Sequence, residues 1–353
     1  MNFKETIFLI KAILETVNQL NFDSKFVVDK HSIGGIPGNR TTPIVVSICA
    51  AAGLIIPKSS SRAITSASGT ADVIETIAKV EFSLEEVKKI VKKTNACLVW
   101  GGGFGIVPAD SKIIRIEKQL GIDPETQLLA SIMSKKIASG AKYILIDIPY
   151  WKTAKVSKRK AMRLKNKFEK LGKYFKKKLK VVLTKGEQPI GQGIGPFLEI
   201  HDVISVLKQD CNCPKDLEEK SIFLAGEILK MTKQGNKETA KEILKSGKAF
   251  KKFNEIIIAQ HGKIPGKIPE AKFKKPIFSE KSGVVKEIDN KKINNLARTS
   301  GAPVDKFAGL KIKFKLKDKI KKGDEILTIY AESASRLKQA INFYKKEKPF
   351  LIE

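Results

Sequence analysis

The chain has 353 residues, 42% of them hydrophobic and 29% charged, which is enough to bury a large core and to form about two or three domains. No apolar run approaches the roughly 18 residues that a membrane-spanning helix needs, so no membrane association is expected. A formal charge of +30 would suit nucleic-acid binding, but only seven of the 67 basic residues are arginine, and the lysines are spread along the chain. We attribute the charge to solubility or to an unusual ionic environment and expect no nucleic-acid partner.

The N-terminus and the cysteines indicate the cellular compartment of the protein and whether it holds a structural metal. The segment MNFKETIFLIKAILETVNQL spaces its apolar residues as an amphipathic helix does and is not a signal peptide. The cysteines are Cys49, Cys97, Cys211 and Cys213, and their spacing fits neither a disulfide framework nor a set of zinc ligands. The sequence therefore predicts a cytoplasmic protein with no structural metal.

From about residue 25 to residue 210, short β-branched runs alternate with helical patterns. Strands are predicted over 25–30, 95–102, 141–149 and 179–185. Helices are predicted over 41–53, 69–80, 123–140 and 157–175. Strands separated by helices pair in parallel, so we expect an α/β fold with a mixed, largely parallel central sheet flanked by helices. In such a sheet the loops after the strands gather on one edge, and ligands bind there.

After about residue 210 the alternation of strands and helices ends. Residues 215–260 are predicted to be helical, and a lysine- and proline-rich connector, His261–Pro276, then breaks the pattern. A small β-rich module with helices follows, in which KDKIKKGDEILTIYA has the turn and strand of biotinyl-like sandwich folds.

The first candidate binding loop is DKHSIGGIPGNRTT, residues 29–42. Lys30, His31 and Ser32 follow a strand there and lead into Gly34 and Gly35. Glycines let backbone N–H groups approach an anion, and a lysine supplies the charge that a phosphate requires. A plain strand-to-helix turn is the alternative, and the pattern is not that of a Walker loop.

The second candidate loop is SSSRAITSASGTADVIE, residues 59–75, in which hydroxyl side chains crowd around Arg62 just before a helix that starts near Thr70. Hydroxyl groups at the positive end of a helix dipole form an anion site. A helix cap would account for only one or two of these hydroxyls, so we favour ligand binding.

Two further segments carry polar side chains after a turn or a strand. Asp123 precedes Pro124, which is the pattern of an N-cap followed by the first helical residue, and it is equally a candidate for contact with a ligand. Ser131 and Lys135 are four residues apart and share one helix face. Lys155, in a loop after a strand, either meets a second phosphate or is simply exposed.

Together these motifs resemble the thymidine phosphorylase and AMP phosphorylase family, and within it the archaeal AMP phosphorylase branch. The resemblance runs from about Glu5 to the C-terminus. It rests on segments in the family's order and spacing: VVDKHSIGGIPGNRTTP, IPKSSSRAITSASGTAD, CLVWGGG, PADSKIIRIE, IDPETQLLASIMSKKIASG, LTKGEQPIGQGIGP and DKFAGLKIKFKLKDKIKKGDEILTIYAES.

The resemblance implies a domain organisation and a reaction. Residues 1–22, with part of the helices in 197–260, would form a partial helical α domain. Residues 23–260 would form the α/β catalytic domain, and residues 277–353 a small C-terminal α+β domain of barrel-sandwich type. The implied reaction is phosphorolysis, in which AMP and inorganic phosphate give adenine and ribose 1,5-bisphosphate in nucleotide salvage. CMP and UMP are further candidate substrates, and no cofactor is implied beyond phosphate as co-substrate.

The family's functional residues carry over position by position. The acid that protonates the leaving base falls on Asp123, and the nucleotide-binding positions fall on Gly35, Ser61, Arg62, Ala63, Ile64, Thr65, Ser66, Thr70, Ser131 and Lys155. In thymidine-specific relatives the segment matching Lys30, His31 and Ser32, together with Thr70, holds the attacking phosphate. In those relatives the positions of Ser131 and Lys135 hold the pyrimidine. A second phosphate on the substrate would give Arg62, Lys155 and Arg40 more charge to neutralise.

Other members of the family carry an additional N-terminal domain and earlier helices of the α domain. We therefore expect a homo-oligomer or association with a separately encoded N-terminal part. The alternatives are a thymidine or pyrimidine-nucleoside phosphorylase, a phosphoribosyltransferase of the same fold with a loop similar to SGTADVIE, and a non-catalytic chain that binds RNA or a partner. Thymidine is disfavoured because only Lys118 or Arg115 stands near the place of an arginine that thymidine-specific relatives carry.

Overall fold

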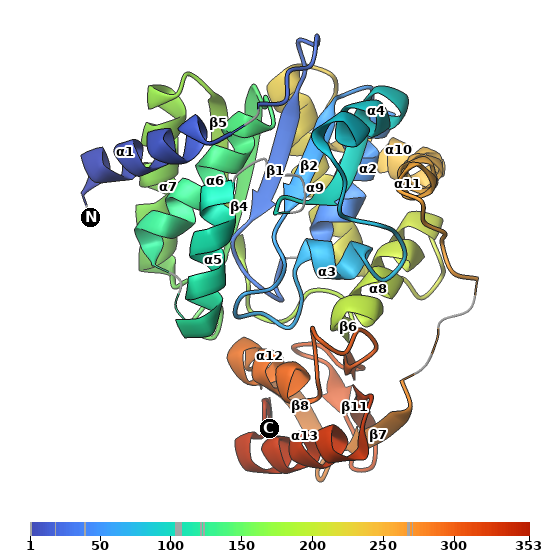
Figure 1. The fold of residues 1–353 in the computed structure, drawn as a ribbon. Helices are drawn as coiled ribbons and strands as arrows, with labels where there is room; N and C mark the ends of the chain where they lie inside the picture. Colours follow the sequence, from blue (N-terminus) through green and yellow to red (C-terminus); the bar gives the residue numbers. More distant parts are fainter. Residues whose placement is uncertain are drawn as a thin grey trace.

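The chain folds into a large α/β unit and a smaller C-terminal unit, which lie one above the other in Figure 1. The structure is a computed structural model that describes residues 2–17, 19–38, 40–102, 108–120, 122, 124–266, 269 and 271–353, with the backbone alone described at 108, 111, 115 and 118.

Parallel strands form the centre of the α/β unit. They are β1 (Val28–Ser32), β2 (Ile56–Ser60), β3 (Ala96–Trp100), β4 (Tyr143–Tyr150) and β5 (Lys178–Lys185). β1 pairs with β4, β4 with β5, and β2 with β3, all in parallel. A parallel bridge between Val27 and Ile55 joins the two groups. The predicted largely parallel sheet is thus confirmed.

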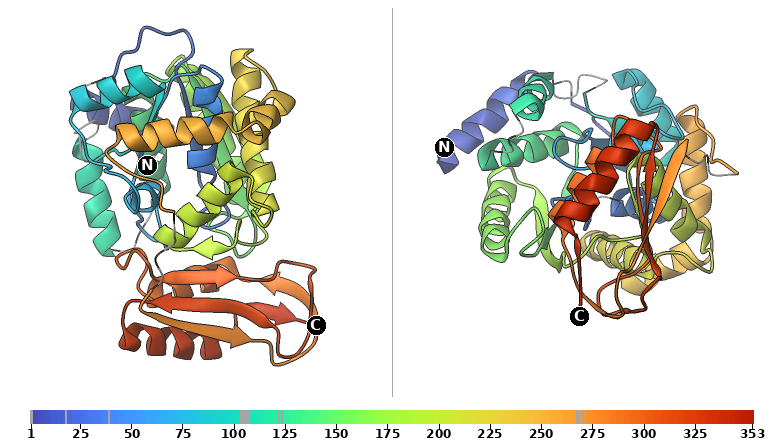
Figure 2. Two further views of the ribbon diagram at one scale, coloured as in Figure 1. Left: turned by 90° about the vertical axis from the view of Figure 1, so that its right-hand side faces the viewer. Right: turned by 90° about the horizontal axis from the view of Figure 1, so that it is seen from below.

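Helices cover both faces of this sheet (Figures 1 and 2). Alternate residues of a strand point to opposite faces, and β4 follows this rule: Tyr143 and Leu145 join one apolar core, while Ile144 and Ile146 join the other. The first core contains residues of α2 (Thr41–Ala51), α3 (Thr70–Ile74), α8 (Pro196–Lys208), α9 (Lys215–Thr232), α10 (Lys237–Lys245) and α11 (Lys248–Ala259). The second contains residues of α1 (Phe3–Glu15), α4 (Leu84–Thr94), α6 (Glu125–Ala138) and α7 (Lys158–Tyr174). Helix α5 (Pro108–Leu120) contacts α1.

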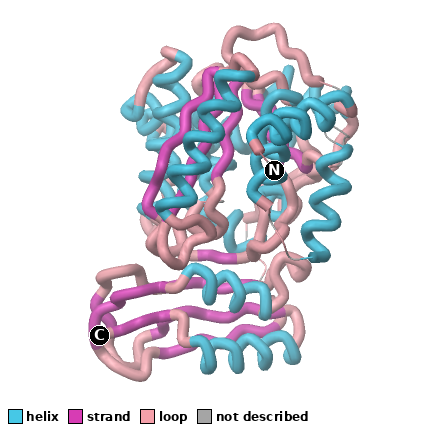
Figure 3. The backbone as a smooth tube through the Cα atoms, turned by 90° about the vertical axis from the view of Figure 1, so that its left-hand side faces the viewer, coloured by secondary structure: helices cyan, strands magenta, loops and turns pink. Residues whose placement is uncertain are grey.

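The C-terminal unit consists of two antiparallel sheets and two helices, α12 (Asn290–Thr299) and α13 (Ala334–Glu347), which Figure 3 shows beside the strands. One sheet has the order β10-β8-β12 and the other the order β6-β9-β11-β7. The strands are β6 (Gly193–Ile194), β7 (Phe273–Phe278), β8 (Gly283–Ile288), β9 (Gly309–Ile312), β10 (Lys319–Ile320), β11 (Glu325–Ala331) and β12 (Phe350–Ile352). Strand β6 directly precedes α8 of the α/β unit in the chain and pairs with β9 of the C-terminal unit, so this sheet connects the two units.

Two local predictions differ from the structure. The helix predicted over 69–80 ends at Ile74. Turn hydrogen bonds continue to Ala78, and the N–H and C=O of Lys79 then bond to Gln260 and not to the preceding turn. Helix α6 begins at Glu125, with Pro124 in an extended conformation at the N-cap position, so Pro124 is not the first helical residue.

In the part of the chain that the structure describes, no helix combines the length and the apolarity required to cross a bilayer.

Candidate active site

A cleft opens beyond the carboxyl ends of β1 and β2, between the loops that follow them and helix α6. The sequence predictions converge on it, since many of the predicted residues line its surface: His31, Ser32, Gly35, Ser61, Arg62, Ala63, Ile64, Thr65, Ser66, Thr70, Ser131, Lys135 and Lys155. Asp123 lies outside the described residues. The parallel sheet therefore brings together residues as far apart in the chain as His31 and Lys155.

Lys30 lies behind the cleft rather than on its surface. Its ammonium is fully buried and donates to the hydroxyls of Thr41 (2.6 Å) and Thr42 (3.2 Å). Of these residues, Thr42 lines the cleft. The contact of Lys30 with a phosphate stays a prediction, and the structure shows its ammonium bonded to the threonine hydroxyls behind the cleft. Burial lowers the pKa of Lys30 to about 7.

The cleft is also lined, from the sheet side, by Lys58 of β2 and Lys136 of α6. The sequence analysis assigned a role to neither lysine. Both pair with the buried carboxylate of Asp29, at 3.5 Å from Lys58 Nζ and 2.7 Å from Lys136 Nζ. Burial lowers the pKa of Lys136, and the attraction of Asp29 opposes this shift. We call Asp29, Lys30, His31, Lys58 and Lys136 the sheet wall.

His31 of the sheet wall is neutral. Its pKa is lowered well below the usual value, first by burial and then by the nearby lysines, Lys136 and Lys58 foremost. A neutral imidazole offers one donor and one acceptor, so His31 can hydrogen-bond an anion without adding a further charge.

Hydroxyl groups complete this side of the cleft. Ser59 and Ser60 line the cleft, and their buried side-chain oxygens have no hydrogen-bond partner among the described residues. Ser32 also lines it, while its hydroxyl donates to the carboxylate of Asp147 at 2.8 Å. Buried hydroxyls without partners cost free energy, and an oxyanion in the cleft would relieve that cost at Ser59 and Ser60.

The opposite side, which we call the helix wall, is organised around the buried carboxylate of Asp110 on α5. It accepts from Gln127 Nε2 (3.0 Å) and from Ser131 Oγ (3.0 Å), and it pairs with Lys135 Nζ at 2.5 Å. Lys135 Nζ also donates to Ser131 Oγ at 2.8 Å, as the predicted shared helix face requires. The charge of Lys135 is therefore balanced within the helix wall.

The hydroxyl-rich loop over residues 61–70 is fixed by a carboxylate from the helix that follows it. Asp72 accepts from the N–H groups of Ala63 (2.7 Å) and Gly69 (2.8 Å). At Gly69 a Cβ atom would lie 2.6 Å from the carbonyl oxygen of Ser61, so no larger residue fits. Gly35, across the cleft, has φ +59, a left-handed conformation that glycine adopts without strain.

Arg62 lines the cleft but its charge is already compensated. Its guanidinium bonds to both carboxylate oxygens of Glu75 (2.6 and 2.7 Å) and to Glu81 (3.1 Å), and it lies over the ring of Trp100. The bond to Arg62 lowers the pKa of Glu75 to about 2. We therefore assign Arg62 chiefly to fixing the loop, and less to the neutralisation of a phosphate that the sequence suggested.

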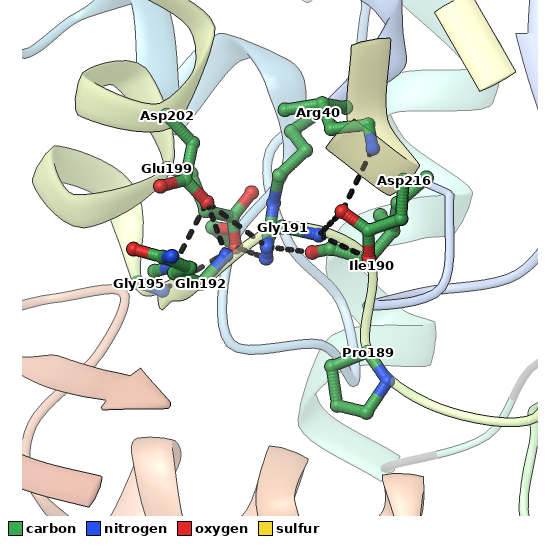
Figure 4. Close-up of polar contacts among 12 residues, drawn as sticks. Arg40, Pro189, Ile190, Gly191, Gln192, Gly195, Glu199, Asp202 and Asp216 are labelled. Atoms are coloured by element: carbon green, nitrogen blue, oxygen red, sulfur yellow. Dashed lines mark hydrogen bonds and ion pairs between the residues drawn. The ribbon is translucent and has the colours of Figure 1, made fainter. Parts of the chain in front are cut away.

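Arg40 does not reach the cleft either. Its side chain is fully buried below it, where it pairs with Glu199 (3.3 Å) and Asp202 (3.6 Å) and donates to the carbonyl of Ile190 (Figure 4). The hydroxyl of Ser68, in the hydroxyl-rich loop, donates to the same Glu199. Arg40 thus links the two loops of the cleft through Glu199, and its charge is already paired with carboxylates.

The carboxylates around Arg40 also hold the turn that leads into the C-terminal unit. Asp202 accepts from the N–H groups of Gln192 (2.7 Å) and Gly193 (2.8 Å), and Asp216 accepts from that of Gly191 at 3.1 Å (Figure 4). Burial raises the pKa of Asp202 to about 6, against the pull of Arg40. Lys315, from the C-terminal unit, pairs with Asp216 at 3.0 Å.

A smaller recess continues from the cleft toward helix α12. Gly34, Gly35, Thr65, Ser66 and Lys155 line both the cleft and the recess. The far side of the recess belongs to α12, so the C-terminal unit closes the cleft at this end.

Family profiles match most of the chain. The family described as "Glycosyl transferase family, a/b domain" matches residues 24–250, and the "Pyrimidine nucleoside phosphorylase C-terminal domain" matches residues 284–350.

Several curated proteins are similar over nearly the whole chain. An AMP phosphorylase of Methanococcus maripaludis is 45% identical over 360 residues, which cover 100% of this chain and 71% of that protein. An AMP phosphorylase of Pyrococcus horikoshii is 48% identical over 350 residues, 97% of this chain and 69% of that protein. A putative thymidine phosphorylase of Ralstonia nicotianae is 43% identical over 349 residues, 97% of this chain and 68% of that protein.

Among solved structures, the anthranilate phosphoribosyltransferase of Thermus thermophilus superposes with a TM-score of 0.58 and 17% identity, covering 74% of this chain and 85% of that one. The corresponding enzyme of Saccharomyces cerevisiae gives a TM-score of 0.54 and 16% identity, covering 74% of this chain and 80% of that one. At such identities the likeness concerns the fold alone.

Proposed function

The chain belongs to the glycosyl transferase family of the AMP and thymidine phosphorylases, and on that premise we propose that it catalyses the phosphorolysis of nucleoside 5′-monophosphates. AMP and inorganic phosphate would give adenine and ribose 1,5-bisphosphate. An oxygen of phosphate forms a bond to the anomeric carbon of the ribose, and the bond from that carbon to the base breaks. The electron pair of the broken bond leaves with the base, which takes a proton from an acid.

The observation that carries the proposal is the charge of the sheet wall. Lys58 and Lys136 line the cleft, both share the carboxylate of Asp29, and Lys30 stands directly behind Thr42. Buried cations exceed the carboxylate charge within this wall, and an anion in the cleft would compensate the excess. The unpaired hydroxyls of Ser59 and Ser60 supply further donors to a phosphate.

The two walls suit the two halves of the reaction. Cleavage of a glycosidic bond passes through an oxocarbenium-like centre, which needs a positioned nucleophile on one face and a proton donor on the other. We assign the attacking phosphate to the sheet wall, with His31, Ser32 and Thr70 as further contacts. We assign the base to the helix wall at Ser131 and Lys135, and proton donation to Asp123, whose role is carried over from the family.

The 5′-phosphate fits the junction of cleft and recess. Lys155 lines both, together with Thr65, Ser66 and the backbone of Gly35. The lysine, the Thr65 hydroxyl and backbone N–H groups provide donors for a phosphate monoester, and the Ser66 hydroxyl would join them by turning from the Ser68 carbonyl to which it donates at 2.8 Å. We assign Ser61, Arg62, Ala63 and Ile64 to the nucleotide as well, through the loop that Arg62 and Asp72 hold in place.

The proposal is tested by incubating the protein with AMP, CMP, UMP, adenosine and thymidine, each with and without phosphate, and measuring free base. Release of adenine from AMP only in the presence of phosphate is the expected result. Release from thymidine alone would favour the nucleoside phosphorylases. Activity with phosphoribosyl pyrophosphate that depends on Mg²⁺ would favour the phosphoribosyltransferases. We propose that no cofactor is needed, so chelation of metals should leave the adenine release unchanged.

We propose nucleoside monophosphates and phosphate as the ligands and the cytoplasm as the compartment. We also propose self-association, or association with a helical polypeptide, through the apolar side chains exposed on α1 and α5. Phe8 is 64% exposed and Leu120 is 64% exposed, and such side chains on neighbouring helices favour an interface. Light scattering of the purified chain tests this, and a monomer that forms no complex at micromolar concentration would contradict self-association.

A further inference from the structure

Helix α12 belongs to the C-terminal unit, yet its side chains bond to the loops of the cleft. Asn294 Nδ2 donates to the carbonyl of Thr65 at 3.0 Å, and Asn294 Oδ1 accepts from the N–H of Ala67 at 2.8 Å. A single amide side chain thus satisfies a backbone acceptor and a backbone donor two residues apart. Figure 1 shows α12 at the junction, between the strands of its own unit and the α/β unit.

The same loop is anchored in the core of the C-terminal unit. The side chain of Ala67 is fully buried there, beside residues such as Leu296 of α12. Ile36, from the glycine-containing loop across the cleft, belongs to the same apolar core. Both substrate-facing loops therefore have one residue inserted into the C-terminal unit, and Asn294 adds the directional contact at Thr65 and Ala67.

We propose that Asn294 is a positioning residue, through which the C-terminal unit sets the conformation of the nucleotide-binding loop over residues 61–70. The inference rests on the proposed function in that this loop binds the nucleotide. Thr65, which accepts one of the Asn294 contacts, and Ser66, which lies between the two contacted residues, both line the cleft. A change in the backbone at Thr65 or Ala67 would move both hydroxyls.

The physical consequence is a shift in loop population. With Asn294 present, the loop is held in the conformation in which Thr65 and Ser66 face the cleft. Without it, two backbone groups lose their partners and alternative loop conformations gain population. For a ligand that binds only the competent conformation, the apparent dissociation constant rises as the fraction of chains in that conformation falls. The rate at which the bound complex reacts does not change.

Hydrogen exchange provides a test that does not depend on turnover. In Asn294→Ala the amide of Ala67 loses its acceptor, and peptides that cover residues 65–69 should exchange faster than in the wild type. Arg298→Ala is the control, because Arg298 lies on the same helix, its side chain is exposed, and it lines neither the cleft nor the recess. Equal exchange in the wild type and Asn294→Ala would overturn the proposal.

Asn294→Asp separates the two contacts. A carboxylate retains the acceptor for the Ala67 N–H but cannot donate to the Thr65 carbonyl. Protection of the Ala67 amide should therefore persist in this variant. Exchange as fast as in Asn294→Ala would count against a specific bond and overturn the assignment.

Kinetics and stability distinguish positioning from a merely structural role. We expect Asn294→Ala to raise the KM for AMP by about tenfold, which corresponds to the loss of one or two hydrogen bonds. The kcat should stay within about twofold of the wild type, and the control Arg298→Ala should leave the KM unchanged. A lowered Tm with an unchanged KM would overturn the proposal. If the wild type releases no adenine from AMP, the proposed function fails, and the exchange experiment still decides the role of Asn294.

Discussion

The two walls of the cleft are each built around one buried carboxylate, and they differ in charge. On the sheet wall Asp29 is shared by Lys58 and Lys136, with Lys30 close behind. On the helix wall Asp110 pairs with a single lysine, Lys135, and accepts two neutral donors. One wall therefore holds more buried lysines than its carboxylate Asp29 can pair, while the single lysine of the other wall is paired with Asp110.

This difference indicates how one cleft can separate its ligands. An excess of buried cations favours a dianion on the sheet wall, where water competes poorly for it. A balanced set of donors and acceptors on the helix wall suits a neutral ring that is read by hydrogen bonds. Variants that alter one wall should therefore affect one ligand more than the other.

The largest effect is expected at Asp123, the proposed proton donor. Asp123→Asn should lower kcat with AMP by at least about 1,000-fold, within the range that general acid catalysis contributes. AMP binding should stay within a few-fold of the wild type, because an amide retains the shape of the side chain. Single-turnover adenine release and equilibrium binding measure the two quantities, and an active Asn variant would remove Asp123 from its role.

Lys58→Met should weaken the binding of phosphate to the sheet wall more than the binding of AMP. Loss of one preorganised cation is expected to reduce phosphate-dependent adenine release by about 100- to 1,000-fold and to raise the KM for phosphate more than the KM for AMP. Lys88→Met is the control, because Lys88 is an exposed residue of α4 that pairs with Glu85 and such pairs contribute little. Equal changes in both KM values would contradict the assignment of phosphate to this wall.

Anion affinity should fall as the pH rises. The pKa of Lys30 is about 7 in the free cleft, and a bound dianion would raise it by favouring the protonated lysine. Binding above pH 7 then requires proton uptake, so affinity should decrease by a factor on the order of 10 to 100 between pH 7 and pH 9.

Sulfate is a suitable probe for this dependence, since its charge does not change over that range. Calorimetry in buffers of different ionisation enthalpy should detect proton uptake on sulfate binding at pH 8. Affinity that is as high at pH 9 as at pH 7, with no proton uptake, would contradict the account of the buried lysines.

The smallest effect is expected at Ser131. Ser131→Ala removes one donor to Asp110 and one acceptor for Lys135, and a net loss of about 1 kcal/mol corresponds to a roughly fivefold higher KM for AMP. The KM for phosphate should not change. A larger change in the KM for phosphate than in the KM for AMP would reverse the proposed use of the two walls.

Sequence patterns predicted the elements that place the loops, because β-branched runs and helical periodicity report burial directly. The parallel order, the loop at Lys30 to Gly35 and the hydroxyls near Arg62 all follow from local composition. The shared face of Ser131 and Lys135 follows from helix geometry and agrees with their 2.8 Å hydrogen bond.

The residues that the sequence did not reveal depend on tertiary contacts. Lys58 follows an apolar run in LIIPKSSS, and Lys136 lies among many lysines, so neither differs in pattern from a surface residue. Asp29 pairs with both lysines only when β1, β2 and α6 have packed together. A lysine inside an otherwise buried strand was the available signal, and β2 is buried along its length.

The sequence did not reveal the partners of two arginines. The family resemblance assigned Arg62 to the nucleotide, and charge made Arg40 a further candidate for a phosphate; in the structure Arg62 pairs with Glu75, and Arg40 pairs with Glu199 and Asp202. These carboxylates are distant in sequence or belong to another helix, so no local pattern shows that the arginine charges are already paired. The same holds for Asn294, whose partners Thr65 and Ala67 lie in the other unit.

The central claim is that this cleft joins inorganic phosphate to the ribose carbon as the base leaves. The most direct measurement is the fate of radiolabelled inorganic phosphate during incubation of the purified chain with AMP. We predict label in ribose 1,5-bisphosphate in amounts equal to the adenine released, and loss of that label in Lys58→Met. Adenine that appears without labelled sugar phosphate would mean hydrolysis, and either that result or the absence of any adenine would contradict the account.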